Sequence, residues 1–215
     1  MSAKKMLVLT GPQGAGNHLW SKIFSLHPEV YGWKTLLDNY WEAHRYAEPF
    51  AECWKNLDLL KEFDWSQSDY YFTSISCPLG IQDSLENPIW MPDIIGFINR
   101  VKDLGINVQI AICGRDQTIL QYQQSRVRGR ETKQQFLNIV DELMPYNPLF
   151  ISQELLYLYK HRYIKSLGDQ LNFPVSYDDS RIEEILKSDA NSKYFTQIER
   201  TELDYITRKV SKLGD

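Results

Sequence analysis

The sequence contains little cysteine and no cysteine pair with the CxxC spacing. Its three cysteines, Cys53, Cys77 and Cys113, lie far apart, and the last two stand in apolar runs typical of strands. This pattern argues against a zinc site and against a disulfide framework, so we expect buried free thiols. A reducing compartment such as the cytoplasm fits this use of cysteine.

The sequence also lacks a long apolar run and an excess of positive charge. The apolar run before Thr10 has only four residues, which is too short for a signal-peptide core or a membrane span. The net charge of −4 argues against a general nucleic-acid-binding surface, because such a surface needs clustered cations. We therefore expect a cytoplasmic protein that binds neither a membrane nor nucleic acid, and we leave its oligomeric state open.

Strand patterns and helix patterns alternate along the chain. Apolar or β-branched runs predict strands at residues 6–10, 29–33, 69–77, 107–113 and 174–177. Helical spacing predicts helices at residues 17–26, 35–63 with a break near Pro49, 92–105, 117–126, 131–144, 149–167, 180–187 and 197–213. This alternation predicts one domain over residues 1–215, an α/β three-layer sandwich with a central parallel sheet flanked by helices, similar to the P-loop NTPases.

Ligands of such sheets bind at the carboxyl ends of the strands. The first strand ends in a glycine-rich turn, in which the spacing of Gly11, Gly14 and Gly16 lets backbone N–H groups face an anion. The helix that follows adds the positive end of its dipole, although an ordinary glycine-rich turn is the alternative. The candidate phosphate-binding residues are Gly11, Pro12, Gln13, Gly14, Ala15, Gly16, Asn17, His18 and Leu19.

The turn GPQGAGNH lacks the two side chains that a nucleotide kinase needs. Asn17 stands where the Walker A motif has lysine, and His18 stands where that motif has serine or threonine. Imidazole is a poor ligand for Mg²⁺, and transfer of a γ-phosphoryl group depends on that metal and on the lysine charge. The sequence therefore predicts a loop that holds a phosphate, is poorly equipped to transfer one, and requires no metal.

The run GPQGAGNHLWSKIFSLHPEV at residues 11–30 resembles the start of the PAPS-dependent sulfotransferases. Many members have G-x-x-[RK]-[ST]-G-T-[ST] after the first strand and then a helix that ends in L-x-x-HP-x-V. Two further segments are similar to the family: Arg115 and Asp116 after the strand NVQIAIC, and VSYDDSRIEEIL at residues 175–186. The resemblance implies a P-loop-like α/β fold, PAPS as sulfuryl donor, PAP as product and no metal requirement.

The chain departs from the family pattern at several positions. Gly14 replaces the basic residue of the loop, and Asn17 and His18 replace a threonine pair. Family members grip the 3′-phosphate of the donor with an arginine and with a serine eight residues later. Here Gln123 lies at that distance from Arg115, while the nearest serine, Ser125, lies two residues further on. Both Gln123 and Ser125 therefore remain candidates.

The family uses a histidine or a glutamate to accept the proton of the acceptor. Glu42 and His44 in NYWEAHR follow the second predicted strand and are the candidates here, with a structural role as the alternative for each. Lys34, just after the same strand, is the candidate cation for the transferring sulfuryl group. The basic run SRVRGR at residues 125–130 either contacts the 3′-phosphate or an acidic acceptor, or is a solvated loop.

The leading hypothesis is a sulfotransferase that moves a sulfuryl group from PAPS to a hydroxyl or amine of an unidentified acceptor. A carbohydrate or protein acceptor fits the His-Pro motif better than a small phenol does. One alternative is a nucleotide or nucleoside kinase with a degenerate loop. The other is a catalytically inactive member of the same fold that binds the donor without turnover.

Overall fold

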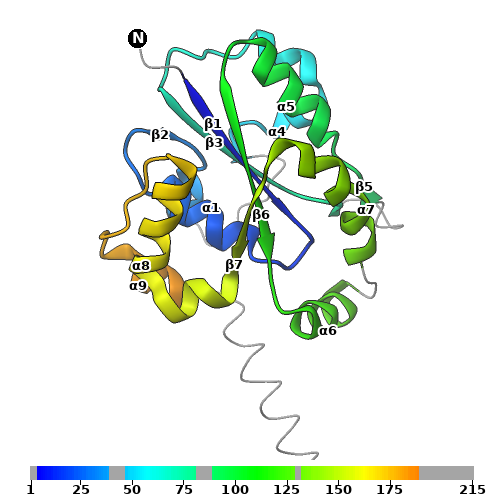
Figure 1. The fold of residues 1–215 in the computed structure, drawn as a ribbon, viewed down its shortest axis with the longest axis vertical. Helices are drawn as coiled ribbons and strands as arrows, with labels where there is room; N and C mark the ends of the chain where they lie inside the picture. Colours follow the sequence, from blue (N-terminus) through cyan, green and yellow to red (C-terminus); the bar gives the residue numbers. More distant parts are fainter. Residues whose placement is uncertain (1–3, 39–46, 81–88, 129–131, 189–215) are drawn as a thin grey trace, which may run out of the picture.

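A five-stranded parallel sheet forms the centre of the molecule (Figure 1). The computed structural model describes residues 4–38, 47–80, 89–128 and 132–188. The strands are β1 (Lys5–Gly11), β2 (Val30–Tyr31), β3 (Tyr70–Ser76), β6 (Asn107–Gly114) and β7 (Leu149–Ser152), in the order β2-β3-β1-β6-β7. Each neighbouring pair in this sheet is parallel, and β4 (Leu79–Gly80) and β5 (Ile89–Trp90) form a separate antiparallel pair.

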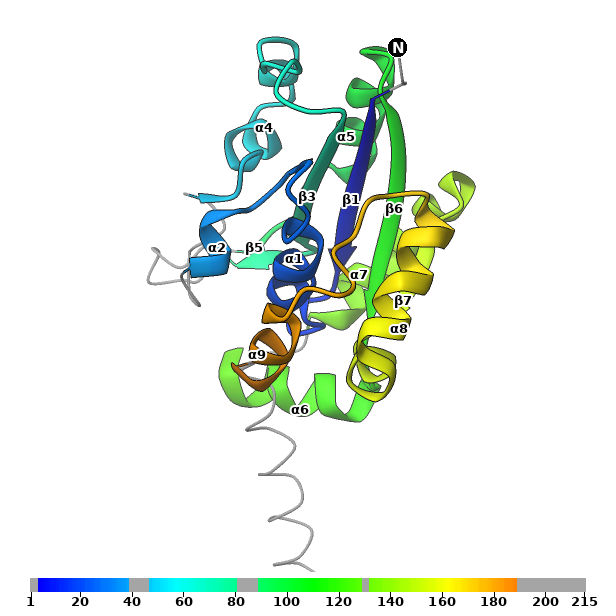
Figure 2. The same ribbon diagram turned by 90° about the vertical axis from the view of Figure 1, so that its left-hand side faces the viewer.

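Helices cover both faces of the sheet, which confirms the predicted α/β three-layer arrangement. The described helices are α1 (Asn17–Ser25), α2 (Thr35–Asp38), α4 (Ala51–Lys55), η1 (Leu57–Lys61), α5 (Ile94–Asp103), α6 (Gln117–Arg128), α7 (Lys133–Leu143), η2 (Met144–Tyr146), α8 (Gln153–Leu171) and α9 (Arg181–Ser188). Figure 2 views the face covered by α1, α8 and α9, while α4, α5 and α7 pack on the other face. Among these helices, none combines the length and apolarity needed to cross a membrane.

The central strand β1 is apolar from Met6 to Leu9 because both of its faces are buried. Leu7 and Leu9 belong to the core beneath α1, α8 and α9, whereas Met6 and Val8 belong to the core beneath α4, α5 and α7. All four side chains are fully buried. The residues of α1 that helical spacing predicts to face the core, including Trp20, are buried in the structure.

The order of the strands places the end of β1 at the point where a ligand is expected. From β1 the chain runs to β2 and β3 on one side, and it then crosses to β6 and β7 on the other side. Gly11 at the end of β1 is level with Ser76 of β3, and Thr10 is level with Ile112 of β6. In open parallel sheets, ligands bind where the strand order reverses in this way.

Three elements differ from the sequence-based expectations. The described part of the helix predicted over residues 35–63 contains the short helices α2, α4 and η1, with irregular residues after Lys61 as well as near Pro49. The periodicity predicts a helix from residue 149, but residues 149–152 form β7 on the edge of β6. The Ser152 side chain accepts a hydrogen bond from the backbone N–H of Leu155, so the helix begins only at Gln153. Residues 174–177 are not a strand, because Pro174 cannot donate to a ladder and Phe173 before it packs into the core. The helix predicted at 197–213 lies outside the described residues.

Candidate functional site

The glycine loop connects the carboxyl end of β1 to the amino end of α1. Gly14 has a φ of 91° and Gly16 a φ of 101°, in the left-handed region that side chains disfavour. Gly16 is also the N-cap of α1 and provides no side-chain cap for that helix. The backbone N–H of Ala15 donates to the carbonyl of Pro12 at 3.1 Å and closes the turn. The sequence thus needs glycine at these two positions to form the loop.

Side chains of β6 and α6 hold three successive carbonyl groups of the loop. Nε2 of Gln124 donates to the carbonyl oxygen of Gln13 at 2.6 Å. Nη1 of Arg115 donates to the carbonyl of Gly14 at 3.0 Å, and the thiol of Cys113 donates weakly to the carbonyl of Ala15 at 2.8 Å. The loop is therefore fixed from the side that faces the sheet and α6.

The direction of these carbonyls determines the direction of the loop N–H groups. In a planar trans peptide, the C=O of one residue and the N–H of the next point to opposite sides. The N–H groups of Gly14 and Gly16 therefore point away from the donors on β6 and α6. The first-turn N–H groups of α1 have no acceptors within the helix and lie next to them. Such a concentration of N–H groups at a helix N-terminus is suited to bind an anion.

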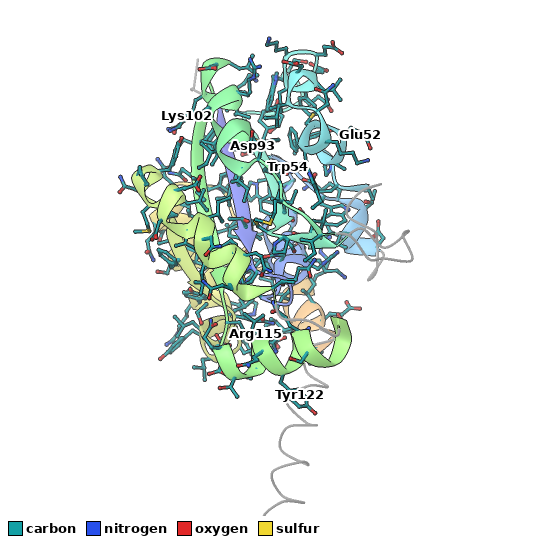
Figure 3. All side chains as sticks on the ribbon, turned by 90° about the vertical axis from the view of Figure 1, so that its right-hand side faces the viewer. Glu52, Trp54, Asp93, Lys102, Arg115 and Tyr122 are labelled. Atoms are coloured by element: carbon teal, nitrogen blue, oxygen red, sulfur yellow. The ribbon has the colours of Figure 1, made fainter. Side chains whose placement is uncertain are left out.

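Arg115 and Gln123 meet at this loop, as the sequence hypothesis requires. Nη1 of Arg115 lies 2.6 Å from Oε1 of Gln123, and Gln123 also lies against Gly14. The Arg115 side chain is only 5% exposed. Figure 3 shows Arg115 at the end of the sheet directly beside α6. Ser125 is exposed on α6, so the structure brings Gln123, and not Ser125, to Arg115.

Asn17, in the position of the Walker lysine, points toward the end of β3. Its Nδ2 donates to Oγ of Ser76 at 2.6 Å and makes a longer bond of 3.4 Å to the carbonyl of Gly11. One turn later, Ser21 donates to the carbonyl of Asn17 and shares a hydrogen bond of 2.6 Å with Ser74. We call Asn17, Ser21, Ser74 and Ser76 the polar seam, because they join α1 to β3 inside the core. These four residues were not predicted to act together. The visible signal in the sequence is the pair of serines at alternate positions of β3, which places two hydroxyl groups on the same face of the strand.

The ring of His18 packs against Trp33, and the two ring centroids are 5.2 Å apart. Trp33 is almost fully buried and belongs to the segment that follows β2. This contact brings that segment to the glycine loop.

Lys34 lies elsewhere, at the opposite end of α1 from the glycine loop. Its ammonium donates to the carbonyls of Ser25 at 2.7 Å and His27 at 2.6 Å, and so it caps the C-terminus of α1. Burial lowers the pKa of Lys34, and the positive charge of Arg181 lowers this pKa further. The reason for this placement is that β2 pairs with the first residues of β3, at Tyr70, so the chain after β2 starts near the amino ends of the strands.

Glu42 and His44, the predicted proton acceptors, lie outside the described residues. The chain becomes described again just before Glu48, a buried carboxyl group that the sequence analysis did not select. Its Oε1 accepts from the hydroxyl of Thr73 at 2.6 Å, and its Oε2 accepts from the backbone N–H of Phe50 at 2.9 Å. Burial raises the pKa of Glu48 to about 8. Glu48 thus fixes the chain after residue 46 to the edge of β3 beyond the end of β2.

A sizeable hollow in the described part of the chain does not coincide with the glycine loop. Its volume is about 910 Å³, and it lies around β2 and the start of β3, where Tyr31, Lys34 and Tyr70 contribute to its lining. Tyr31 and Tyr70 are level with the first residues of β1, so the hollow lies toward the amino ends of the strands. We assign the candidate site to the loop because its hydrogen-bonding groups converge there.

The three cysteines are buried free thiols, as the sequence predicts. Burial raises the pKa of Cys53 and of Cys77 to about 11, and it also raises the pKa of Cys113. Within residues 4–38, 47–80, 89–128 and 132–188, no group of three His, Cys, Asp or Glu side chains is placed to hold a metal ion.

Comparison with known proteins adds no assignment to this geometry. No protein-family model matches the chain, and no curated protein shows significant similarity to it.

Proposed function

We propose that the chain is a sulfotransferase that binds PAPS at residues 11–19 and transfers its sulfuryl group to a hydroxyl or an amine. The observation that carries this proposal is the glycine loop, whose N–H groups at the start of α1 face away from β6 and α6. A loop of this kind holds a phosphate through its backbone, and it has Asn17 in place of the lysine that a kinase uses. The resemblance of residues 11–30 to the sulfotransferases agrees with this geometry.

The donor carries two anionic ends, and the loop and Arg115 provide a place for each. The N–H groups of Gly14 and of residues 16–18 would hold the 5′-phosphosulfate, while the N–H of Ala15 closes the turn on Pro12. Arg115 and Gln123 would contact the 3′-phosphate, because they lie together beside the loop. A guanidinium has five N–H donors, so one arginine can brace the carbonyl of Gly14 and also contact a phosphate.

The donor supplies the sulfuryl group of the reaction. A bond forms between the acceptor oxygen or nitrogen and sulfur, while the bond from sulfur to the bridging oxygen breaks and its electron pair leaves with PAP. The loop N–H groups would stabilise the charge that develops on the leaving phosphate. The proton of the acceptor would pass to Glu42 or His44. Glu48 would act indirectly, because it anchors the chain just after these two residues to β3.

A binding module without turnover is the second candidate. The observation that favours it is the position of Lys34, whose ammonium caps the far end of α1 and is not beside the loop. A member of the fold with a complete donor site, but without Lys34 at the transferring group, would bind PAPS and transfer nothing from it.

The test is calorimetric titration with PAP, compared with ADP plus Mg²⁺, on the wild type, on Arg115→Ala and on Arg100→Ala. Arg100 is the matched control, because it lies on α5 and pairs with Asp58 at 3.2 Å. We expect metal-independent PAP binding that weakens by about tenfold or more in Arg115→Ala and is unchanged in Arg100→Ala. Tight binding of ADP with Mg²⁺ and no preference for PAP would overturn the proposal in favour of a kinase.

Turnover separates the enzyme from the binding module. We would incubate the protein with PAPS that is radiolabelled at sulfur and with panels of glycans and peptides, and follow PAP release. Transfer of label establishes the enzyme, whereas PAP binding without release or transfer establishes the module.

A further inference from the structure

Gln124 connects the glycine loop to the start of α7 through a single side-chain amide. Its Nε2 donates to the carbonyl of Gln13 at 2.6 Å, and its Oε1 accepts from the backbone N–H of Thr132 at 2.8 Å. The side chain is fully buried, and its two backbone partners belong to residues that are buried as well. Both ends of the amide are therefore used, and each serves a backbone group that is shielded from water.

A glutamine is required at this position by the chemistry of its partners. The carbonyl of Gln13 needs a donor, and the N–H of Thr132 needs an acceptor, so one side chain has to offer both. An ionised glutamate would only accept, and a methionine of similar size would do neither. A buried carbonyl or N–H group that loses its partner raises the free energy of the folded state.

The bond to Gln13 acts on the peptide unit between Gln13 and Gly14. Because Gly14 has a φ of 91° and glycine tolerates both signs of φ, this peptide unit can turn over at low conformational cost. One orientation presents the Gly14 N–H to an anion, and the other presents the Gln13 carbonyl, which repels it. The bond from Gln124 retains the carbonyl on the α6 side.

We infer that Gln124 is a positioning residue, which sets the orientation of the Gln13–Gly14 peptide for anion binding. This inference rests on the proposed function, since it concerns the same loop. Gln124 does not contact the ligand in this role. It acts through the direction of the Gly14 N–H, and Arg115 acts in the same sense on the next peptide through the Gly14 carbonyl.

The experiment compares the wild type with Gln124→Met, Gln124→Glu and Gln134→Met. Gln134→Met is the matched control, because Gln134 is exposed on α7 and bonds to Asn138 within the same helix. Binding of PAP and of inorganic phosphate is measured by calorimetry. The amide signals of Gly14 and Gly16 are followed by nuclear magnetic resonance during the phosphate titration.

We expect PAP affinity to fall by about tenfold in Gln124→Met and to stay unchanged in Gln134→Met. In the wild type, phosphate moves the Gly14 signal, and in Gln124→Met this response is reduced. Gln124→Glu separates the two ends of the amide only when its carboxyl group is ionised, so it is measured over a pH series beside the wild type: the protonated group, which burial favours, can donate to Gln13 and accept from Thr132, whereas the carboxylate accepts from Thr132 and cannot donate to Gln13. Loss of affinity in this variant assigns the effect to the loop.

Unchanged PAP affinity in folded Gln124→Met, which can neither donate nor accept, would overturn the inference while leaving the proposed function intact. Failure of the wild type to bind either PAP or phosphate would overturn the proposed function and the inference with it. If neither Gln124 variant folds, the inference is tested on the wild type by measuring the hydrogen exchange of the Gln124 side-chain amide protons. Slow exchange that becomes slower with PAP supports the inference, and exchange as fast as that of Gln134 contradicts it.

Discussion

Replacement of Glu48 by glutamine is expected to stabilise the protein at neutral and alkaline pH. The Glu48 carboxyl group is buried and has a pKa of about 8, compared with an ordinary value of 4.5. A glutamine has the same shape as the protonated glutamate. It can donate to Oγ1 of Thr73 and still accept from the backbone N–H of Phe50, so both contacts at the edge of β3 survive.

The magnitude follows from the difference in proton binding between the folded and unfolded states. Below the unfolded pKa, both states hold the proton and the group has no effect on stability. Between roughly pH 4.5 and 8, only the folded state holds it, so the free energy of unfolding falls as the pH rises, by about 1.4 kcal/mol per pH unit. Across the whole window this contribution reaches about 5 kcal/mol, and above the folded pKa it levels off.

The assay is urea denaturation of the wild type and Glu48→Gln at several pH values from roughly pH 5 to 9. Tryptophan fluorescence is a suitable signal, because Nε1 of Trp54 donates to the same hydroxyl of Thr73. Glu52→Gln is the control, since Glu52 is exposed on α4 and should leave the pH dependence unchanged. Equal pH dependence in the wild type and Glu48→Gln, or lower stability of the variant at about pH 8, would refute the reasoning.

Three further substitutions test other parts of the site. Gly16→Ala places a Cβ 2.8 Å from Oε1 of Gln153 at a residue with positive φ. We expect the free energy of unfolding in urea to fall by about 1–2 kcal/mol and PAP binding to be lost. Wild-type affinity for PAP would contradict the loop geometry. Lys34→Met removes the C-terminal cap of α1 and should lower stability by about 1 kcal/mol without changing PAP affinity; a loss of turnover at unchanged stability would instead place Lys34 in the reaction. Ser21→Ala removes the hydrogen bond between the hydroxyl groups of Ser21 and Ser74, and it should cost about 1–2 kcal/mol in thermal or urea unfolding. An unaltered midpoint would show that the polar seam contributes little.

The fold was largely predictable because its central strands and α1 carry strong local signals. β1 has a run of four apolar residues, β3 and β6 are rich in aromatic or β-branched residues, and the apolar residues of α1 follow helical spacing. The boundary between β7 and α8 was not predictable in this way. Three apolar residues next to a helix fit either pattern, and the choice depends on the Ser152 cap and on the edge that β6 offers for pairing.

The site was predictable only where topology determines position. Arg115 follows β6, which neighbours β1, so its approach to the loop follows from a parallel sheet. The position of Lys34 was not predictable, because it depends on which residues of β3 pair with the two residues of β2. The role of Gln124 was hidden for a similar reason. Its partners, the carbonyl of Gln13 and the N–H of Thr132, are backbone groups that every sequence contains.

The polar seam has a consequence for how such a protein tolerates change. Apolar contacts between a helix and a sheet are nondirectional, so a helix held by them alone can rotate or slide slightly with little loss of energy. Hydrogen bonds from Asn17 and Ser21 to Ser76 and Ser74 permit only one alignment. A variant with apolar residues at all four positions could fold with similar stability, because no polar group would be left unpaired. Its α1 would have lost the hydrogen bonds that align it with the sheet, so the position of the glycine loop at the start of α1 would vary before the stability fell.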